Sequence, residues 1–147
     1  MASVEVRSFN MKRVFFGKVA YGSDLLEAIK SLIEANNIKT GIVLALGAVR
    51  KARIGYYDQS EKKYIEMEIN EPLEIVSCLG NVIRTESETI VHLHVTLGRR
   101  NGTTIGGHLL SGTKVFSCEV SILELEGPKV TREFDELTGL KLIQFTD

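Results

Sequence analysis

The sequence contains no tryptophan, and its 147 residues include only two prolines and two cysteines. Cys78 and Cys118 stand alone, without the Cys-x-x-Cys spacing of thiolate zinc sites and without the further cysteines of a disulfide framework. Free thiols buried in a protein of a reducing compartment are the simpler interpretation. The cysteine content therefore favours a cytoplasmic protein.

A strong charge of one sign and a long apolar run are also missing. The formal net charge is -1, so no strong field draws the whole molecule to nucleic acid or to an acidic membrane, although a local basic patch is compatible with this value. No apolar run approaches the roughly 20 residues that a membrane helix requires. The first residues lack the basic start and apolar middle of a secretion signal. We therefore expect no membrane partner.

The residues that are present indicate one folded domain with one helix. Hydrophobic residues make up 44% and charged residues 25% of the sequence, which is typical of folded proteins, and the length suits a single domain over residues 1–147. Ser23 or Asp24 can cap a helix that ends at residues 36–37, and Glu27 can return a bond to the backbone. Apolar residues follow at helical spacing, namely Leu26, Ile29 and Ile33.

Strand-like patterns separated by short turns dominate the rest of the chain. Strands are predicted over residues 12–21, 41–49, 53–58, 63–69, 73–82 and 114–126. A bulge or a close approach of two backbones is expected near Gly80, and residues 131–147 carry enough apolar side chains to pack back onto the domain. The predicted fold class is α/β (α+β), a mostly antiparallel sheet with one main covering helix.

All three histidines of the sequence lie between residues 92 and 108. His92 and His94 alternate with apolar residues, and this period of two predicts a strand with both imidazoles on one face. The Asn-Gly pair at residues 101–102 suits a tight hairpin turn. Such a hairpin would return His108, which follows two glycines, to the side of the first two histidines.

Two interpretations of this cluster stay open. Three imidazoles around one point, with one position left open, form a known catalytic zinc arrangement, and zinc is the first choice although nickel, copper and iron also accept imidazole. Alternatively, the histidines have a structural role and hydrogen-bond to the backbone. If a metal binds, the neutral ligands leave a dication that attracts an anion or acidifies a bound water.

Two carboxylates are candidates for the catalytic base or orienting group of such a site. Glu74 and Glu119 each lie inside an otherwise apolar strand. A carboxylate in that setting either faces solvent or is buried beside a cation, and the surroundings of a metal would supply such a partner.

Two basic clusters are candidates for contact with phosphates or with another anionic ligand. Arg50 and Arg53 lie between two predicted strands, and Arg99 and Arg100 lie at the predicted hairpin tip, where a solvated turn is the usual interpretation. The sequence has no Gly-x-x-x-x-Gly-Lys phosphate loop, and no helix-turn-helix, zinc finger or aromatic RNA-binding motif accompanies these arginines.

Four stretches of the sequence together resemble a known family. Residues 21–29 look like the first helix of that family, and residues 41–49 end in its Gly-Ala-Val. Residues 73–81 are similar to its Phe-Glu-Ile-Leu-Ser-Leu-x-Gly-Asn signature, with Leu73 in place of the usual Phe. The His-x-His and Gly-Gly-His motifs match at residues 92–95 and 106–109. In this order the motifs resemble the plants-and-prokaryotes-conserved (PPC) domain in its stand-alone prokaryotic form.

The resemblance implies an α/β domain that assembles as a homotrimer, with a metal bound by the motif histidines, here His92, His94 and His108. In plant relatives the domain accompanies an AT-hook and the proteins bind A·T-rich DNA, and prokaryotic members are often described as DNA-binding on that basis. The present sequence has no Arg-Gly-Arg-Pro hook, whose arginines would enter a narrow minor groove.

Three functional hypotheses follow. The first is a homotrimeric zinc-binding domain that binds a small anionic ligand or performs metal-assisted chemistry. The alternative is a DNA-binding or regulatory protein that uses the basic clusters. The third is an interaction module that presents its surface to another protein.

Overall fold

The computed structural model describes residues 4–146, so residues 1–3 and 147 of the predicted domain lie outside the described part. Its elements in chain order are β1 (Asn10–Val19), α1 (Leu25–Ala35), β2 (Thr40–Asp58), β3 (Lys63–Ile69), β4 (Leu73–Arg84), β5 (Thr89–Gly98), β6 (Thr104–Leu109), β7 (Lys114–Glu126), β8 (Lys129–Asp135) and β9 (Leu140–Thr146). This confirms the predicted mixed fold, in which strands dominate and one helix covers the sheet.

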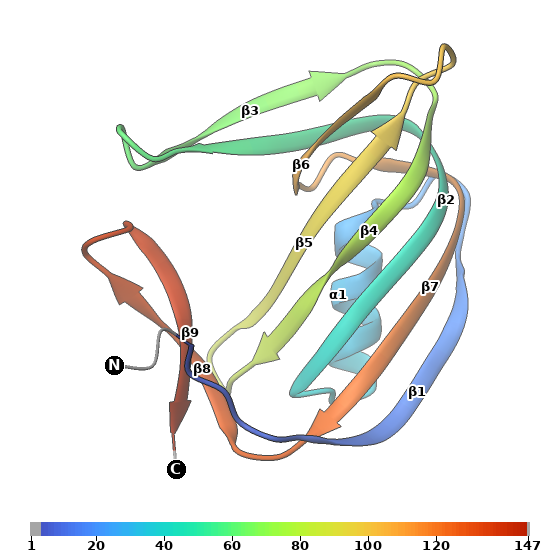
Figure 1. The fold of residues 1–147 in the computed structure, drawn as a ribbon. Helices are drawn as coiled ribbons and strands as arrows, with labels where there is room; N and C mark the ends of the chain where they lie inside the picture. The colour runs from blue at the N-terminus through green and yellow to red at the C-terminus, as the bar shows by residue number, and fades with distance from the viewer. Residues whose placement is uncertain (1–3, 147) are drawn as a thin grey trace.

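Seven strands form one antiparallel sheet in the order β1-β7-β2-β4-β5-β6, with β3 paired to the far part of β2. The helix α1 covers one face of this sheet, and among the described residues no helix covers the opposite face (Figure 1). We call this second side the open face. The hairpin β8–β9 is a separate two-stranded sheet and lies opposite the hairpin β2–β3 in Figure 1.

The helix begins where the sequence predicts. Of the two candidate caps, Asp24 is the one used, because its Oδ1 accepts from the backbone N–H of Glu27 at 3.2 Å. The Glu27 carboxylate accepts from the Ser111 hydroxyl instead of bonding back to the backbone. The apolar stripe of the helix is buried against the sheet at Leu25, Ile29 and Ile33.

Two strands differ from the prediction. Residues 41–49 and 53–58 belong to the single strand β2. The buried side chains of Ala52 and Ile54 continue the inward face of this strand past the basic residues. β4 runs without a break through Gly80, and its irregular register lies between Ile75 and Ser77 instead. Gly80 marks the predicted close approach, since a Cβ there would lie 1.8 Å from the carbonyl oxygen of His92.

The remaining predictions concern the core and the C-terminal segment. Cys78 and Cys118 are buried and free, as expected, and burial raises the pKa of the Cys78 thiol to about 12. The C-terminal segment packs back onto the domain as the hairpin β8–β9, whose Arg132 side chain reaches β4 at Asn81. Within residues 4–146, no helix has the length and apolar character needed to cross a membrane.

Candidate metal centre

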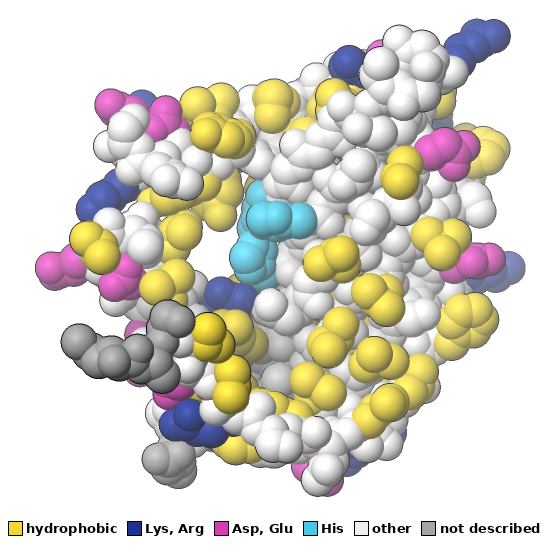
Figure 2. All heavy atoms as spheres, viewed as in Figure 1, with side chains coloured by type: hydrophobic (Ala, Val, Ile, Leu, Met, Phe, Trp, Pro, Cys, Tyr) yellow, Lys and Arg dark blue, Asp and Glu magenta, His cyan; other side chains and the backbone are white. Residues whose placement is uncertain are grey.

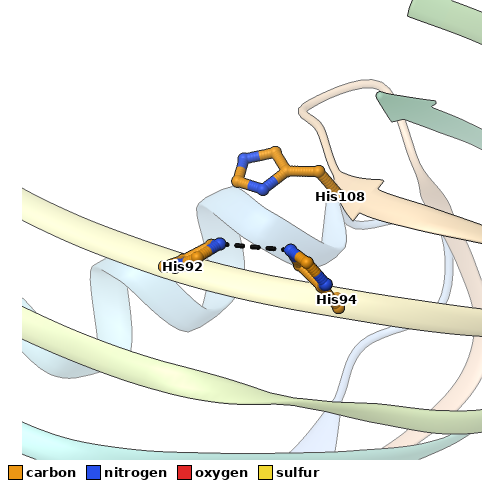
Figure 3. A group of neighbouring side chains, drawn as sticks. All are labelled: His92, His94 and His108. Carbon is orange, nitrogen blue, oxygen red and sulfur yellow. Dashed lines mark hydrogen bonds between the residues drawn. The ribbon is translucent and has the colours of Figure 1, made fainter. Parts of the chain in front are cut away.

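The structure brings the three histidines together on the open face. His92 and His94 come from β5 and His108 comes from β6, where it pairs directly with His94. Because Leu93 and Val95 are buried on the helix side of β5, the neighbouring histidines point to the opposite side. Figure 3 shows the three rings facing one another. The predicted convergence is confirmed.

The distances suit shared coordination of one ion. The Nε2 atoms of His92 and His94 lie 3.2 Å apart, and the ring centroids of His92 and His108 are 5.0 Å apart. One ligand atom from each residue can be chosen so that all three lie within 4.8 Å of one another. Three imidazoles at this spacing fit the ligand number of an open tetrahedral zinc site.

A tight turn and close strand packing create this arrangement. In the turn between β5 and β6, Gly102 adopts a φ of +83°, and Asn101 accepts from the backbone N–H of Thr103 at 3.0 Å. On β6, a Cβ at Gly107 would lie 2.6 Å from the carbonyl oxygen of Gly55. A side chain at this position is therefore excluded, and β6 can pack against β2 immediately beside His108.

The surroundings of His92 and His108 favour the neutral imidazole, the form that binds a metal. Burial, then the nearby His108, Arg132 and His94, lower the pKa of His92 to about 4. Burial, then the nearby His94 and Arg132, lower the pKa of His108. His108 Nδ1 is buried and has no hydrogen-bond partner, which is unfavourable for a polar atom. A metal ion would satisfy this nitrogen, so the residues fit such a group.

Sequence reasoning missed two residues that border the histidines. Arg132 of β8 donates to Asn81 Oδ1 at 2.8 Å, and the same Nη2 atom lies 3.4 Å from His92 Nδ1. The Tyr64 ring of β3 lies 5.0 Å from the His108 ring. Asn81 pairs with His92 across β4 and β5, and a pairing of the two predicted strands could have indicated this contact. No local sequence pattern connects residue 132 to residue 92.

The histidines line an opening on the open face, visible in Figure 2. The hairpins β2–β3 and β8–β9 meet across it at their tips. The Tyr57 hydroxyl donates to the carbonyl of Thr138 at 2.7 Å, and Lys62 Nζ donates to the carbonyl of Glu136 at 2.7 Å. The two hairpins and the edge of the main sheet therefore enclose the approach to the imidazoles.

The open face beside the histidines is apolar. In the strand register, Leu44 of β2 pairs with Leu79 of β4, which pairs with His94. Leu79 is 54% exposed, and Figure 2 shows further hydrophobic side chains scattered over the same face. Further exposed apolar residues of the sheet include Phe16 of β1, Ile42 and Leu46 of β2, Val76 of β4 and Phe116 of β7. Monomeric proteins rarely expose a large apolar surface of this kind.

The structure does not bring the two predicted carboxylates to the histidines of the same chain. Glu74 is exposed, pairs with Gly98 at the far end of β5 and lines a pocket there. Glu119 is also exposed and lies on β7, which β2 and β4 separate from β5. Neither residue touches an imidazole within the described part of the chain.

Three of the four predicted arginines do converge. Arg50, Arg99 and Arg100 line the pocket that includes Glu74, and Lys51 and Lys114 complete the set. We call these five cations the basic groove. Arg53 is separate, because it bonds to Glu66 and to the carbonyl of Ser111.

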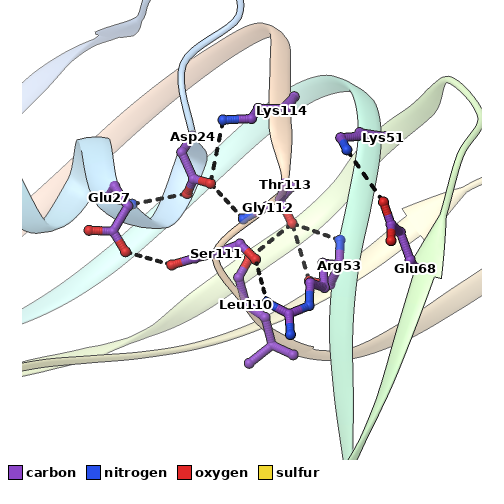
Figure 4. Close-up of polar contacts among 10 residues, drawn as sticks. All are labelled: Asp24, Glu27, Lys51, Arg53, Glu68, Leu110, Ser111, Gly112, Thr113 and Lys114. Atoms are coloured by element: carbon purple, nitrogen blue, oxygen red, sulfur yellow. Dashed lines mark hydrogen bonds and ion pairs between the residues drawn. The ribbon is translucent and has the colours of Figure 1, made fainter.

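Most of the basic groove is already paired with carboxylates. Arg99 Nε lies 2.8 Å from a Glu71 oxygen. Figure 4 shows two further pairs, Lys51 with Glu68 at 3.3 Å and Lys114 with Asp24 at 3.8 Å. The Arg50 guanidinium lies 5.2 Å from the Tyr21 ring centroid. The groove thus combines cations with an aromatic surface, and both can contact an anionic polymer.

Comparison with known proteins gives one consistent family. The sequence pattern of the Plants and Prokaryotes Conserved (PCC) domain, also abbreviated PPC, matches residues 6–126. The structure of a metal-containing protein from Archaeoglobus fulgidus is 45% identical, with a TM-score of 0.88 over 95% of this chain and 98% of that one. A PPC protein from Pyrococcus horikoshii is 31% identical, with a TM-score of 0.89 over 98% and 99% of the two chains.

More distant relatives share the fold with this chain but do not assign it an activity. A protein from Bacteroides thetaiotaomicron whose name proposes DNA binding is 21% identical, with a TM-score of 0.83 over 93% of this chain and 97% of that one. The bifunctional protein GlmU of Synechococcus sp. (strain JA-2-3B'a(2-13)) is 28% identical over 120 residues. That match covers 80% of this chain but 18% of the relative, so the chain spans about a fifth of the length of the curated relatives it matches.

Proposed function

Because the chain belongs to the Plants and Prokaryotes Conserved domain family, we propose that it is a metal-binding domain in which His92, His94 and His108 hold one divalent transition-metal ion. The observation that carries this proposal is the buried, unpartnered Nδ1 of His108 beside two further imidazoles. The 45% identical protein from Archaeoglobus fulgidus is metal-containing, which supports the same conclusion. Zinc is the first candidate, since it accepts three imidazole ligands with one position open.

The ligand of this centre is a small anion. Three neutral imidazoles leave the full charge of a divalent ion, which would attract an anion or acidify a bound water. The enclosed approach between the hairpins β2–β3 and β8–β9 suits a small molecule better than a polymer. Binding is favoured over hydrolysis within one chain, because neither Glu74 nor Glu119 reaches the imidazoles.

We further propose that the domain is a homotrimer whose open faces contact one another. The exposed apolar side chains of β1, β2, β4 and β7 support this assembly, since monomers rarely expose large apolar patches. Glu74 and Glu119 are exposed on strands of the same sheet, so a neighbouring copy could supply either carboxylate as the base at the histidines. We therefore propose a catalytic role for Glu74 or Glu119 only across the interface between two copies.

Metal analysis of protein purified without an affinity tag tests the metal proposal. After incubation with zinc and removal of the excess, we expect about one ion per chain, because three imidazoles already brought together favour binding. Fewer than about 0.1 ion per chain after this treatment would contradict the proposal.

Sedimentation tests the assembly. We expect a trimer that the Leu46→Glu substitution on the open face dissociates, because the change buries an unpaired charge in the interface. Leu137→Glu is the matched control, since Leu137 is 85% exposed in the turn between β8 and β9. A wild-type monomer would refute the assembly, and so would equal behaviour of the two variants.

A second candidate function is DNA binding through the basic groove. It is supported by the convergence of Arg50, Arg99 and Arg100, and a structural neighbour carries a name that proposes DNA binding. Duplex A·T-rich DNA should then bind with an affinity that falls steeply as salt is added. Absence of binding at low salt would remove this candidate.

A further inference from the structure

Arg132 is a cation whose position the metal centre alone does not explain. Its side chain reaches from β8 to the histidines, where Nη2 donates to Asn81 Oδ1 at 2.8 Å and lies 3.4 Å from His92 Nδ1. Its Nη1 donates to the carbonyl of Lys141 at 3.1 Å. The Nε–H group is buried and has no hydrogen-bond partner.

No carboxylate of residues 4–146 balances this guanidinium. Arg13, Arg53 and Arg99 each form an ion pair with a carboxylate. In the described part of the chain, the hydrogen-bond partners of Arg132 are instead an amide, a carbonyl and an imidazole. A partly buried cation without an anion is unfavourable, and burial lowers the pKa of Arg132. The missing counter-charge would be supplied by an anionic ligand.

Metal binding would increase this need. If His92 coordinates a metal through Nε2, its Nδ1 carries the proton and becomes a donor. It can then no longer accept from Arg132, so the guanidinium loses that contact. The ion and the guanidinium would place two positive groups on opposite sides of the same imidazole.

We propose that Arg132 is the anion-recognition residue of the histidine centre and that the ligand carries a small carboxylate group. The inference rests on the proposed metal-binding function and specifies its ligand. One carboxylate oxygen would occupy the open position of the metal, and the Arg132 guanidinium, released from His92 Nδ1, would turn toward the second oxygen and donate to it. A guanidinium presents coplanar donors that match a planar carboxylate.

Cobalt-substituted protein allows a test that does not depend on activity, because an anion that enters the open position changes the visible spectrum of the bound ion. Acetate is the probe, with neutral acetamide as the matched control molecule and sulfate as a tetrahedral anion, all at constant ionic strength. The variants are Arg132→Gln, Arg132→Lys and, as the control, Lys129→Gln. Lys129 lies on the same strand, three residues away and exposed, so its substitution removes a charge from the hairpin without touching the centre.

We expect acetate, but not acetamide, to change the spectrum of the wild-type protein. Arg132→Gln should weaken acetate binding at least about tenfold while the cobalt affinity changes by less than about threefold. The acetate affinity of Arg132→Lys should lie between those of the wild type and of Arg132→Gln, because lysine keeps the charge but lacks the planar pair of donors. Lys129→Gln should match the wild type.

Three results would overturn the inference. Arg132→Gln could bind acetate as tightly as the wild type. Both Arg132 variants could lose cobalt in parallel with acetate, which would make Arg132 a support for His92 alone. Sulfate could bind more tightly than acetate, which would assign the centre to tetrahedral anions.

Failure of the metal proposal can be separated from failure of this inference. If no cobalt binds, the first proposal fails, and the role of Arg132 is then measured in metal-free protein by the NMR signal of its Nε–H group. An acetate-dependent shift of that signal, absent with acetamide, would support anion recognition by Arg132. An unchanged signal would refute it.

Discussion

The histidine centre lies on β5 and β6, and the basic groove lies where β2, β7 and the turn after β5 meet. The two regions differ in what the chain leaves unpaired. At the centre, a buried imidazole nitrogen and a buried guanidinium N–H group have no partner. In the groove, three of the five cations already contact carboxylates at 2.8–3.8 Å. A ligand of the centre meets unsatisfied groups, whereas a ligand of the groove must compete with existing ion pairs.

The two regions also differ in exposure. Exposed ion pairs contribute little to stability and are weakened by salt, so the groove can exchange its partners at small cost. The histidine centre is enclosed by two hairpins and by close backbone contacts. A cluster of charged side chains is therefore a weaker indicator of a specific ligand than a small set of unsatisfied buried atoms.

The largest expected effect separates the two regions directly. His108→Ala should weaken metal binding at least about 100-fold, because it removes one of three ligands. Arg100→Gln in the basic groove should leave the metal affinity unchanged. Competition titrations with a chromophoric chelator measure both variants. Equal metal affinity of His108→Ala and wild type would place the metal elsewhere.

A pair of glycines tests the difference in packing between the two ends of β4 and β5. Gly80→Ala should lower the free energy of unfolding by about 1–3 kcal/mol or more, because the new Cβ would lie 1.8 Å from the carbonyl oxygen of His92. Gly98→Ala should cost less, since its nearest obstacle is the exposed Val76 side chain at 3.1 Å. Urea unfolding of metal-free protein measures both. Equal losses would contradict the tighter packing at Gly80.

Glu124 provides a third case, a buried carboxylate that the chain pairs with its own cations. A hydrogen bond from Arg13, together with the charges of Arg13 and Lys12, lowers the pKa of Glu124. The unfolded chain therefore binds a proton at higher pH than the folded protein does. The resulting stabilisation is present above the ordinary Glu pKa of about 4.5 and is lost as pH falls through the lowered value.

Glu124→Gln should accordingly reduce stability at neutral pH and flatten the acid part of the stability profile. Urea midpoints measured between about pH 3 and pH 7 would detect both changes. Glu126→Gln on the same strand is the control, because that side chain is 67% exposed. A Glu124→Gln profile as steep as that of the wild type would disprove the assigned pairing.

The smallest expected effect concerns the basic groove. If the groove binds DNA, Arg50→Gln and Arg100→Gln should each weaken binding uniformly across sequences and reduce the salt slope by about 1. Fluorescence anisotropy over a series of salt concentrations measures the slope. Arg53→Gln is the control outside the groove. An equal change of slope in all three variants would show that the groove is not the contact surface.

Local patterns were enough to predict the helix and the histidine hairpin. The cap at Asp24 and the alternation around His92 and His94 depend on residues close in sequence, and the Asn-Gly turn fixes the return of His108. Arg132 could not be predicted in this way, because its contact with His92 depends on how a separate hairpin docks on β4. Likewise, the location of Glu74 beside Arg50 depends on strand order, which single-strand patterns do not determine.

The hairpin β8–β9 lies beyond residues 6–126, the part of the chain that matches the family. It forms its own small sheet, and side chains rather than a strand ladder connect it to the main sheet. Substitutions in this hairpin can therefore change which group faces the imidazoles while the seven-stranded sheet keeps its register. Exchanging this hairpin for that of a relative would therefore alter the surroundings of the imidazoles without rebuilding the sheet that carries them.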